Sequence, residues 1–270
     1  MTEYIEVSGG RIAYDVTGEG PLVILAPGMG DLRSTYRLLG PELVRAGYRV
    51  VTTDLRGHGE SSTPFASYDN TSAGADLVAL IRHLGGPAVI VGHSFSGGSA
   101  VWAAGEDASL VNGLVLVGAF TRPVSMNLFM TQLARLVLGF PALWGMYYKT
   151  LFKGPKPADF AEHLAAVKAN MREKGRMAAA REMGLGTKTD MDGRLGRVTA
   201  PTLIMYGTKD PDFPDPEAEA GIVAGELAGK TETVMIEGAG HYPHQEFPAE
   251  TAAAVLAFLG QVAPTTQGAA

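Results

Sequence analysis

The chain has 270 residues, of which 46% are hydrophobic and 19% charged, a composition that supports a large packed core and argues against bulk disorder. The formal net charge is −6, and no run of Lys and Arg could neutralise a row of phosphates, which excludes a nucleic-acid-binding function. Cys is absent, so disulfides, a thiolate nucleophile and a Cys-ligated metal are excluded as well.

The first half of the chain alternates between strand and helix patterns. An N-terminal hairpin is expected around Gly9 and Gly10, followed by an apolar run that suits a strand buried on both faces. Such alternation predicts a mostly parallel sheet with helices on both faces. The expected strands are 3–8, 11–17, 21–26, 49–53, 88–91 and 113–117, and the expected helices are 34–46, 70–84 and 95–104.

The rhythm breaks between about 121 and 196, where aromatic and Met residues precede an Ala-, Lys- and Glu-rich helical run from Ala158 to Met183. We interpret this stretch as a helical cap lying over the sheet. The alternation then resumes and brings the expected strands to eight, with strands at 201–206 and 233–237 and helices at 215–228 and 248–259. The expected domains are an α/β core of residues 1–120 and 197–262, a cap of residues 121–196, and a flexible tail of residues 263–270.

No targeting segment is evident. Residues 1–4 lack the basic and apolar regions of a secretory signal. The most apolar stretch, 126–148, contains Arg135 and Pro141 and falls short of the ~20 apolar residues that a membrane helix needs. We therefore expect a cytoplasmic protein with no membrane partner; the sequence leaves its oligomeric state open.

Residues 89–97 run from an apolar strand directly into a predicted helix, with Ser94 at the junction. A serine on such a sharp turn points its hydroxyl away from the backbone, and the turn leaves little room for Cβ atoms two positions to either side. Gly92 fills the first small position; Ser96 stands where a glycine is usual and is small enough to fit. The pattern predicts Ser94 as a nucleophile, and a Gly- and Ser-rich loop that merely starts a helix is the alternative.

A serine hydroxyl needs a base within hydrogen-bond reach, and histidine suits because its unperturbed pKa of ~6.5 lies near working pH. His241 follows the last predicted strand in a loop of small residues that can carry the imidazole over the strand ends. We predict His241 as the base, with His244 as the alternative. His83 and His163 lie in predicted helices and are interpreted as surface or packing residues, and the turn should point His93 elsewhere.

The base needs a carboxylate that orients it. Asp210 stands four positions after the end of the strand at 201–206 and is the predicted acid. Asp212 and Asp215 stand nearby in a Pro-rich turn, where turn formation or helix capping also accounts for them. No carboxylate directly follows the strand at 113–117.

Together these segments resemble the α/β-hydrolase fold family over residues 4–260. The resemblance implies a mostly parallel eight-stranded sheet with helices on both faces and a helical cap. It also implies the order nucleophile, acid, base, which Ser94, Asp210 and His241 follow. It is carried by residues 27–30 (PGMG), 54–61 (DLRGHGES), 92–97 (GHSFSG), 207–210 (GTKD) and 240–241 (GH), each at the end of a predicted strand. The turn at 56–59 is interpreted as structural.

Acyl transfer builds negative charge on an oxygen, and backbone N–H donors placed at that point stabilise it. We predict an oxyanion hole from the amides of Met29 and Phe95. For the segment at Met29, a Gly-rich turn between strand and helix is the alternative interpretation. The cap should roof the pocket, and an apolar or aromatic acyl substrate is expected. The predicted substrate-binding residues are Gly28, Phe129, Trp144 and Tyr148.

The expected activity is hydrolysis of a small carboxylic ester, with lactone, thioester or amide cleavage using the same parts. A cofactor-free perhydrolase or haloperoxidase and a C–C bond hydrolase are alternatives on the same fold. A ligand sensor is a third possibility, because plant strigolactone and karrikin receptors and bacterial stress-signalling relatives share Gly-His-Ser-x-Ser. Haloalkane dehalogenase and epoxide hydrolase chemistry needs a carboxylate where this chain has Ser94. No cofactor is expected, and no metal, because His241 and His244 have no further ligand cluster at suitable spacing.

Overall fold

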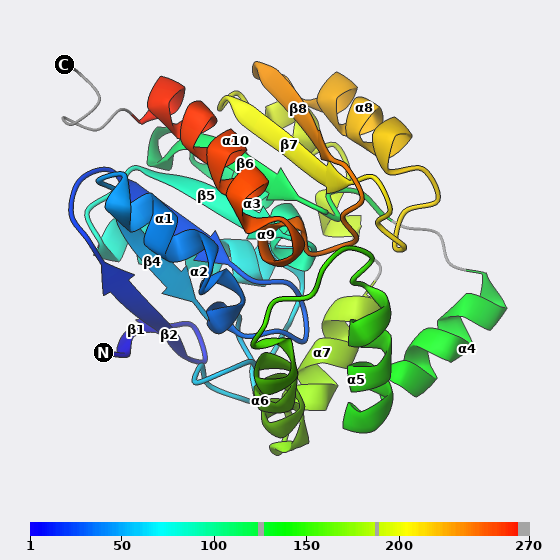
Figure 1. The fold of residues 1–270 in the computed structure, drawn as a ribbon. Helices are drawn as coiled ribbons and strands as arrows, with labels where there is room; N and C mark the ends of the chain where they lie inside the picture. Colours follow the sequence, from blue (N-terminus) through cyan, green and yellow to red (C-terminus); the bar gives the residue numbers. More distant parts are fainter. Residues whose placement is uncertain (124–126, 187–188, 264–270) are drawn as a thin grey trace.

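In the computed structural model, residues 1–123, 127–186 and 189–263 are described below. Eight strands form one sheet in the spatial order β1-β2-β4-β3-β5-β6-β7-β8 (Figure 1). β1 and β2 pair antiparallel with each other and β2 with β4, and strands β3 to β8 run parallel. This confirms the predicted fold class. The strands are β1 (Glu3–Val7), β2 (Gly10–Thr17), β3 (Leu22–Ala26), β4 (Arg49–Thr53), β5 (Ala88–His93), β6 (Val111–Val117), β7 (Thr202–Gly207) and β8 (Thr231–Ile236).

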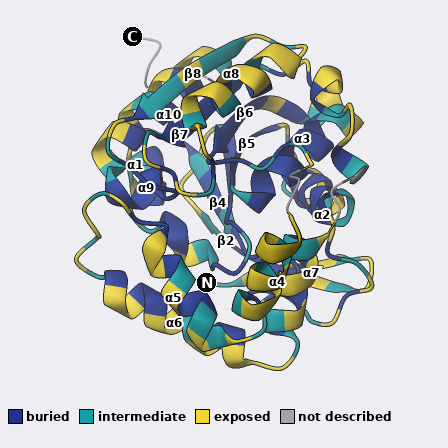
Figure 2. Ribbon diagram, turned by 90° about the vertical axis from the view of Figure 1, so that its right-hand side faces the viewer, coloured by how far each residue is buried: buried dark blue, intermediate teal, exposed yellow. Residues whose placement is uncertain are grey.

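Helices cover both faces of the sheet because the central strands are apolar on both sides. On β3, Val23 and Leu25 pack into a cluster with the first group of helices, while Ile24 packs into the cluster of the second. The first group is α1 (Leu39–Arg45) and α10 (Pro248–Val262); the second is α2 (Asn70–His83), α3 (Phe95–Glu106) and α8 (Pro216–Glu226). Figure 2 shows the central strands buried and exposed residues on outer helices such as α8.

Two predicted helices are broken in the structure. The expected helix at 34–46 is a short 3-10 turn, η1 (Arg33–Tyr36), followed by α1; the Tyr36 hydroxyl donates to the carbonyl of Ala26 at 2.8 Å. The expected run 158–183 is two helices, which Gly175 separates with a φ of +89°, a conformation that side chains other than glycine seldom adopt. Short elements complete the chain: η2 (Ala108–Leu110), η3 (Thr189–Met191), η4 (Leu195–Arg197) and α9 (Pro243–Glu246).

Between β6 and β7 lie four helices that we call the helical insertion: α4 (Leu128–Val137), α5 (Pro141–Thr150), α6 (Phe160–Arg172) and α7 (Arg176–Leu185). They have an apolar cluster of their own, built around Trp144, Tyr148 and Val167. Asp31, a buried residue in the loop after β3, connects to these helices. Its carboxylate accepts hydrogen bonds from the Tyr148 hydroxyl at 3.1 Å and from His163 Nε2 at 3.0 Å. The helical insertion is therefore fastened to the loop that follows β3.

Candidate active site

The turn between β5 and α3 places Ser94 at a sharp corner. Its φ is +53° and its ψ −119°, and it is the one non-glycine residue with positive φ among those the structure describes. Such strain costs about 1–3 kcal/mol and persists only where the surroundings enforce it. A Cβ at Gly92 would lie 2.6 Å from the carbonyl oxygen of Ser96, so the residue two positions before Ser94 has to be glycine. The turn thus holds the Ser94 hydroxyl out of the backbone at the carboxyl edge of the sheet.

Ser96, which departs from the usual glycine, has a role that sequence reasoning missed. Its Oγ donates a 2.5 Å hydrogen bond to the carbonyl of Pro27, which begins the loop after β3. A glycine could not make this bond. Ser96 is therefore more than a tolerated small residue, since it ties the nucleophile turn to the predicted oxyanion loop.

His241 and Asp210 form the hydrogen-bonded pair that the sequence predicts as base and acid. His241 Nδ1 donates to Asp210 Oδ2 at 2.8 Å, and both side chains are almost fully buried. The backbone N–H of His241 donates to the carbonyl of Leu151 at 2.8 Å, which fixes the loop. With Nδ1 engaged, Nε2 is the nitrogen left for Ser94, and Ser94 and His241 line one cavity of about 360 Å³.

The rival histidines have other partners. His244 is buried, its ring is stacked on Tyr36 with centroids 5.0 Å apart, and its Nε2 lies 3.2 Å from Thr35 Oγ1. It does not line the cavity of Ser94. His93 Nε2 donates to the backbone carbonyl of His241 at 2.8 Å, and burial lowers the pKa of His93 to about 3. A neutral His93 thus holds the backbone of the predicted base.

Asp212, the alternative acid, lies on the opposite side of the imidazole from Asp210. Its Oδ2 is 3.7 Å from His241 Nε2, and its Oδ1 accepts a hydrogen bond from the Tyr147 hydroxyl. Burial alone would lower the pKa of His241, but the carboxylates of Asp210 and Asp212 outweigh burial and raise that pKa to about 9. The imidazole therefore carries a proton at neutral pH in this arrangement.

The loop after β3 is held from several sides. The N–H of Gly30 donates to His58 Nε2 at 2.9 Å, and its carbonyl accepts from Trp144 Nε1 at 3.0 Å. Burial lowers the pKa of His58 to about 4, which keeps the ring neutral and able to accept at Nε2. The turn at 56–59, interpreted from sequence as structural, thus supports the predicted oxyanion loop directly. Met29 and Phe95, whose amides are the predicted donors, both line the cavity.

The cavity is apolar on most sides, and its lining includes one of the four predicted substrate-binding residues. Trp144 lines it, together with Met and Leu side chains from α4 and α7. Phe129 does not line it, since its side chain is 74% exposed on α4. Tyr148 is fully buried in the core of the helical insertion and also lies outside the lining. Gly28 is outside it too, packed so tightly that a Cβ there would lie 3.0 Å from Ser94 Cβ. Aromatic content alone could not reveal which way each ring faces.

Helix α5 and the residue that follows it contact three of the loops at the carboxyl edge of the sheet. Trp144 bonds the carbonyl of Gly30 in the loop after β3, and Tyr147 bonds Asp212 in the loop after β7. The carbonyl of Leu151, at the C-terminal end of α5, accepts from the N–H of His241 in the loop after β8. The helical insertion is therefore part of the framework that positions the predicted base and oxyanion donors.

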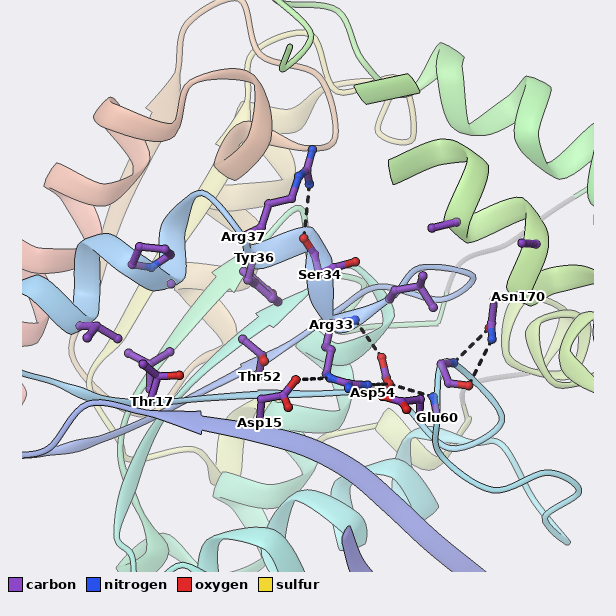
Figure 3. A pocket seen from close by; sticks show the side chains of 18 of the residues that line it. Asp15, Thr17, Arg33, Ser34, Tyr36, Arg37, Thr52, Asp54, Glu60 and Asn170 are labelled. Carbon is purple, nitrogen blue, oxygen red and sulfur yellow. Dashed lines mark hydrogen bonds and ion pairs between the residues drawn. The ribbon is translucent and has the colours of Figure 1, made fainter. Parts of the chain in front are cut away.

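A larger cavity of about 860 Å³ lies between β2, β4, η1 and α6 (Figure 3). Four of its charged groups are paired with one another: Arg33 reaches Asp15, Asp54 and Glu60 at once, as Figure 3 shows. Asp54 is buried, so a charge left without Arg33 would be costly, and the network is well explained by stability. Because this cavity contains neither Ser94 nor His241, the smaller one is the candidate site.

Three side chains at the site could approach a metal ion: ligand atoms of Asp210, Asp212 and His241 lie within 4.8 Å of one another. The pairing of Asp210 Oδ2 with His241 Nδ1, and of Asp212 Oδ1 with Tyr147, already engages much of this donor set. These bonds fit a base oriented by its acid, and we assign no metal role to the group.

The comparisons with known proteins agree with the observed fold. The model of the family described as "Alpha/beta hydrolase family" matches residues 23–254. Epoxide hydrolase A of Mycobacterium tuberculosis is 28% identical over 94% of this chain and 96% of that protein. Among solved structures, a bromoperoxidase from Bacillus anthracis superposes with a TM-score of 0.84 at 21% identity, covering 96% of this chain and 99% of its own. An esterase from Exiguobacterium antarcticum gives 0.84 at 20% identity with the same coverage.

Proposed function

We propose that this chain, which belongs to the alpha/beta hydrolase family, cleaves a small carboxylic ester through an acyl-enzyme on Ser94. The observation that carries the proposal is the bond of His241 Nδ1 to Asp210 Oδ2, which leaves Nε2 for a serine lining the same cavity. Nucleophile, base and orienting acid are the three parts that hydroxyl catalysis requires. A serine at this position argues against epoxide hydrolysis through a carboxylate nucleophile, the chemistry that the name of one relative suggests.

In the first step, Ser94 Oγ attacks the ester carbonyl while His241 Nε2 takes its proton. Asp210 keeps the imidazole oriented and stabilises the imidazolium. The amides of Met29 and Phe95 hold the negative oxygen of the tetrahedral intermediate, and His241 then gives its proton to the departing alcohol. In the second step, water activated by His241 attacks the acyl carbonyl and releases the carboxylic acid from Ser94.

The lining of the cavity supports an apolar acyl group. Most of its side chains are Met, Leu, Val, Phe and Trp, and the charged ones are Asp212 and His241 beside the predicted nucleophile. Burying an apolar acyl group against this lining is favourable in proportion to the apolar area that is removed from water. A volume of about 360 Å³ favours a short or medium acyl chain.

The test is a panel of p-nitrophenyl esters of rising acyl length, run together with a fluorophosphonate that labels activated serines. We expect turnover to peak at short or medium chains, and mass spectrometry to place a single phosphonate on Ser94. Peracetic acid formation from acetate and peroxide, or cleavage of a vinylogous diketone, without ester turnover would favour the perhydrolase or the C–C hydrolase instead. A protein that neither turns over an ester nor takes the label would refute the proposal.

The pH dependence should depend on Asp212. With a pKa of about 9, wild-type His241 is protonated at pH 7 and accepts the Ser94 proton only as the pH rises. Asp212→Asn removes one carboxylate near the imidazolium, so the acid limb of kcat/KM should move to lower pH by about one unit or more. At pH 7 the variant should then be faster than the wild type.

The matched control for this measurement is Tyr147→Phe, which removes the hydrogen bond to Asp212 but keeps both carboxylates. Its acid limb should not move to lower pH. If the profiles of Asp212→Asn and the wild type superpose, Asp212 has no influence on the base.

A further inference from the structure

Helix α4 is apolar yet buries none of its residues. Leu128 is 77% exposed, Phe129 74% and Leu136 52%, and Met146 on the neighbouring α5 is 65% exposed. Figure 1 shows α4 at the edge of the molecule, and Figure 2, in which this side faces the viewer, colours it mainly as exposed and intermediate. Large apolar side chains gathered this way on one element mark a surface that contacts another apolar phase.

The exposed face is continuous with the mouth of the catalytic cavity. Met130 and Leu133 of α4 line that cavity and are also 48% and 44% exposed. Phe129 and Leu136 lie two turns apart on the flank of the same apolar arc, outside the lining. An apolar molecule held at this face would have an unbroken apolar path to Ser94.

The charge of this region differs from that of the whole chain. Residues 127–150 contain Arg135 and Lys149 and no acidic residue, whereas the chain carries a net charge of −6. Both cations are exposed. Apolar side chains flanked by Lys or Arg are the composition of helices that lie in the interface of an anionic bilayer.

The length and bend of these helices suit a surface position. No single helix of the described residues is long and apolar enough to cross a membrane, but α4 and α5 meet that criterion together, with a bend of 114° between them. Two short helices at such an angle can each lay an apolar side on a lipid surface.

We propose that α4 and the adjoining side of α5 bind an anionic lipid surface and place the mouth of the catalytic cavity against it. This departs from the expectation of no membrane partner. The occupant is this lipid surface, and an apolar substrate would pass from it into the cavity along Met130 and Leu133. The proposal concerns binding and holds whether or not the chemistry at Ser94 is ester cleavage.

The experiment is flotation of the full chain with vesicles of phosphatidylglycerol and phosphatidylcholine, compared with phosphatidylcholine alone. We expect the wild type to float with the anionic vesicles, and binding to weaken as salt is raised. The double variant Phe129→Ser/Leu136→Ser should bind at least about tenfold more weakly, because its apolar contact area is reduced. Arg135→Gln should lower binding to the anionic vesicles only.

The matched control is Ile222→Ser, which removes a 42% exposed apolar side chain on α8, outside the helical insertion. It should bind as the wild type does. Because Phe129 and Leu136 lie outside the cavity lining, the double variant should hydrolyse a water-soluble short-chain ester at the wild-type rate, which also shows that it is folded.

Three outcomes would overturn the proposal. The wild type could fail to float, the double variant could float as the wild type does, or sedimentation could reveal a dimer that only the double variant abolishes. The last result would assign the face to a second copy of the chain. Failure to bind vesicles with ester turnover intact would count against this proposal alone. Vesicle binding without ester turnover would count against the catalytic proposal alone.

Discussion

Ser94→Ala is expected to lower kcat/KM for the preferred p-nitrophenyl ester by about 10⁴-fold or more, the scale on which loss of a catalytic serine acts in hydrolases. The reason is that no other hydroxyl can take its place at the corner between β5 and α3, where the backbone holds a φ of +53°. The alanine variant keeps the cavity and the amides of Met29 and Phe95, so it should still bind substrate. Initial rates at several ester concentrations give kcat and KM separately, and the loss should lie in kcat.

The matched control is Ser99→Ala, on the same helix. Ser99 is buried and its Oγ donates to Asn70 at 3.2 Å, away from the catalytic cavity. It should retain activity within about threefold, since it removes one ordinary hydrogen bond. A Ser94→Ala protein with wild-type rates and an intact circular dichroism spectrum would show that the nucleophile lies elsewhere.

Asp210→Asn is expected to reduce kcat by about 10³- to 10⁴-fold, because an amide at this position favours the wrong tautomer of the base. The carboxylate accepts from His241 Nδ1 at 2.8 Å, which leaves Nε2 as the nitrogen that can act as the base. An asparagine can donate from its nitrogen to Nδ1, which would leave the proton on Nε2. Single-turnover kinetics with a slow ester should show acylation itself slowed.

Asp212→Asn is the comparison that decides between the two aspartates. It should keep most of the activity at its own optimum and change the pH profile. If Asp212→Asn instead loses activity by 10³-fold or more while Asp210→Asn stays active, then Asp212 is the acid that orients His241, and Asp210 only changes the pH profile. The distances favour Asp210, at 2.8 Å from Nδ1 against 3.7 Å between Asp212 and Nε2.

The fold could be predicted because its signals are local. The apolar runs of the strands, the turn at Gly9 and the strand-to-helix junction at Ser94 each occupy a few consecutive residues. Predicted and observed strands differ by two residues or fewer at each end. The helix interruptions were harder to predict: the run from Ala158 to Met183 was expected to be continuous, although the positive φ of Gly175 separates it into two helices.

The candidate site was predictable only where strand order determined it. Parallel strands deliver their carboxyl ends to one edge, so Ser94, Asp210 and His241 could be expected to converge. The supporting contacts were not predictable, because they join residues far apart in the chain. Nothing near His58 indicates that it accepts the N–H of Gly30, and nothing near His163 indicates its bond to Asp31.

The cap residues illustrate a further limit. Phe129 and Tyr148 are both aromatic and both belong to helices of the insertion, yet one faces solvent and the other is fully buried. A helix pattern shows which residues share a side, but not what that side packs against. Only the placement of α4 and α5 separates the pocket-lining Trp144 from these two.

The triple contact of α5 has a consequence for how such proteins can diversify. If the helical insertion only covered the pocket, it could be exchanged between relatives with a change in substrate preference alone. Here one helix reaches Gly30, Asp212 and His241, so a transplanted roof without equivalents of Trp144 and Tyr147 would loosen the reaction centre beneath it. Chimaeras of this scaffold should therefore retain activity only when the graft leaves α5 in place.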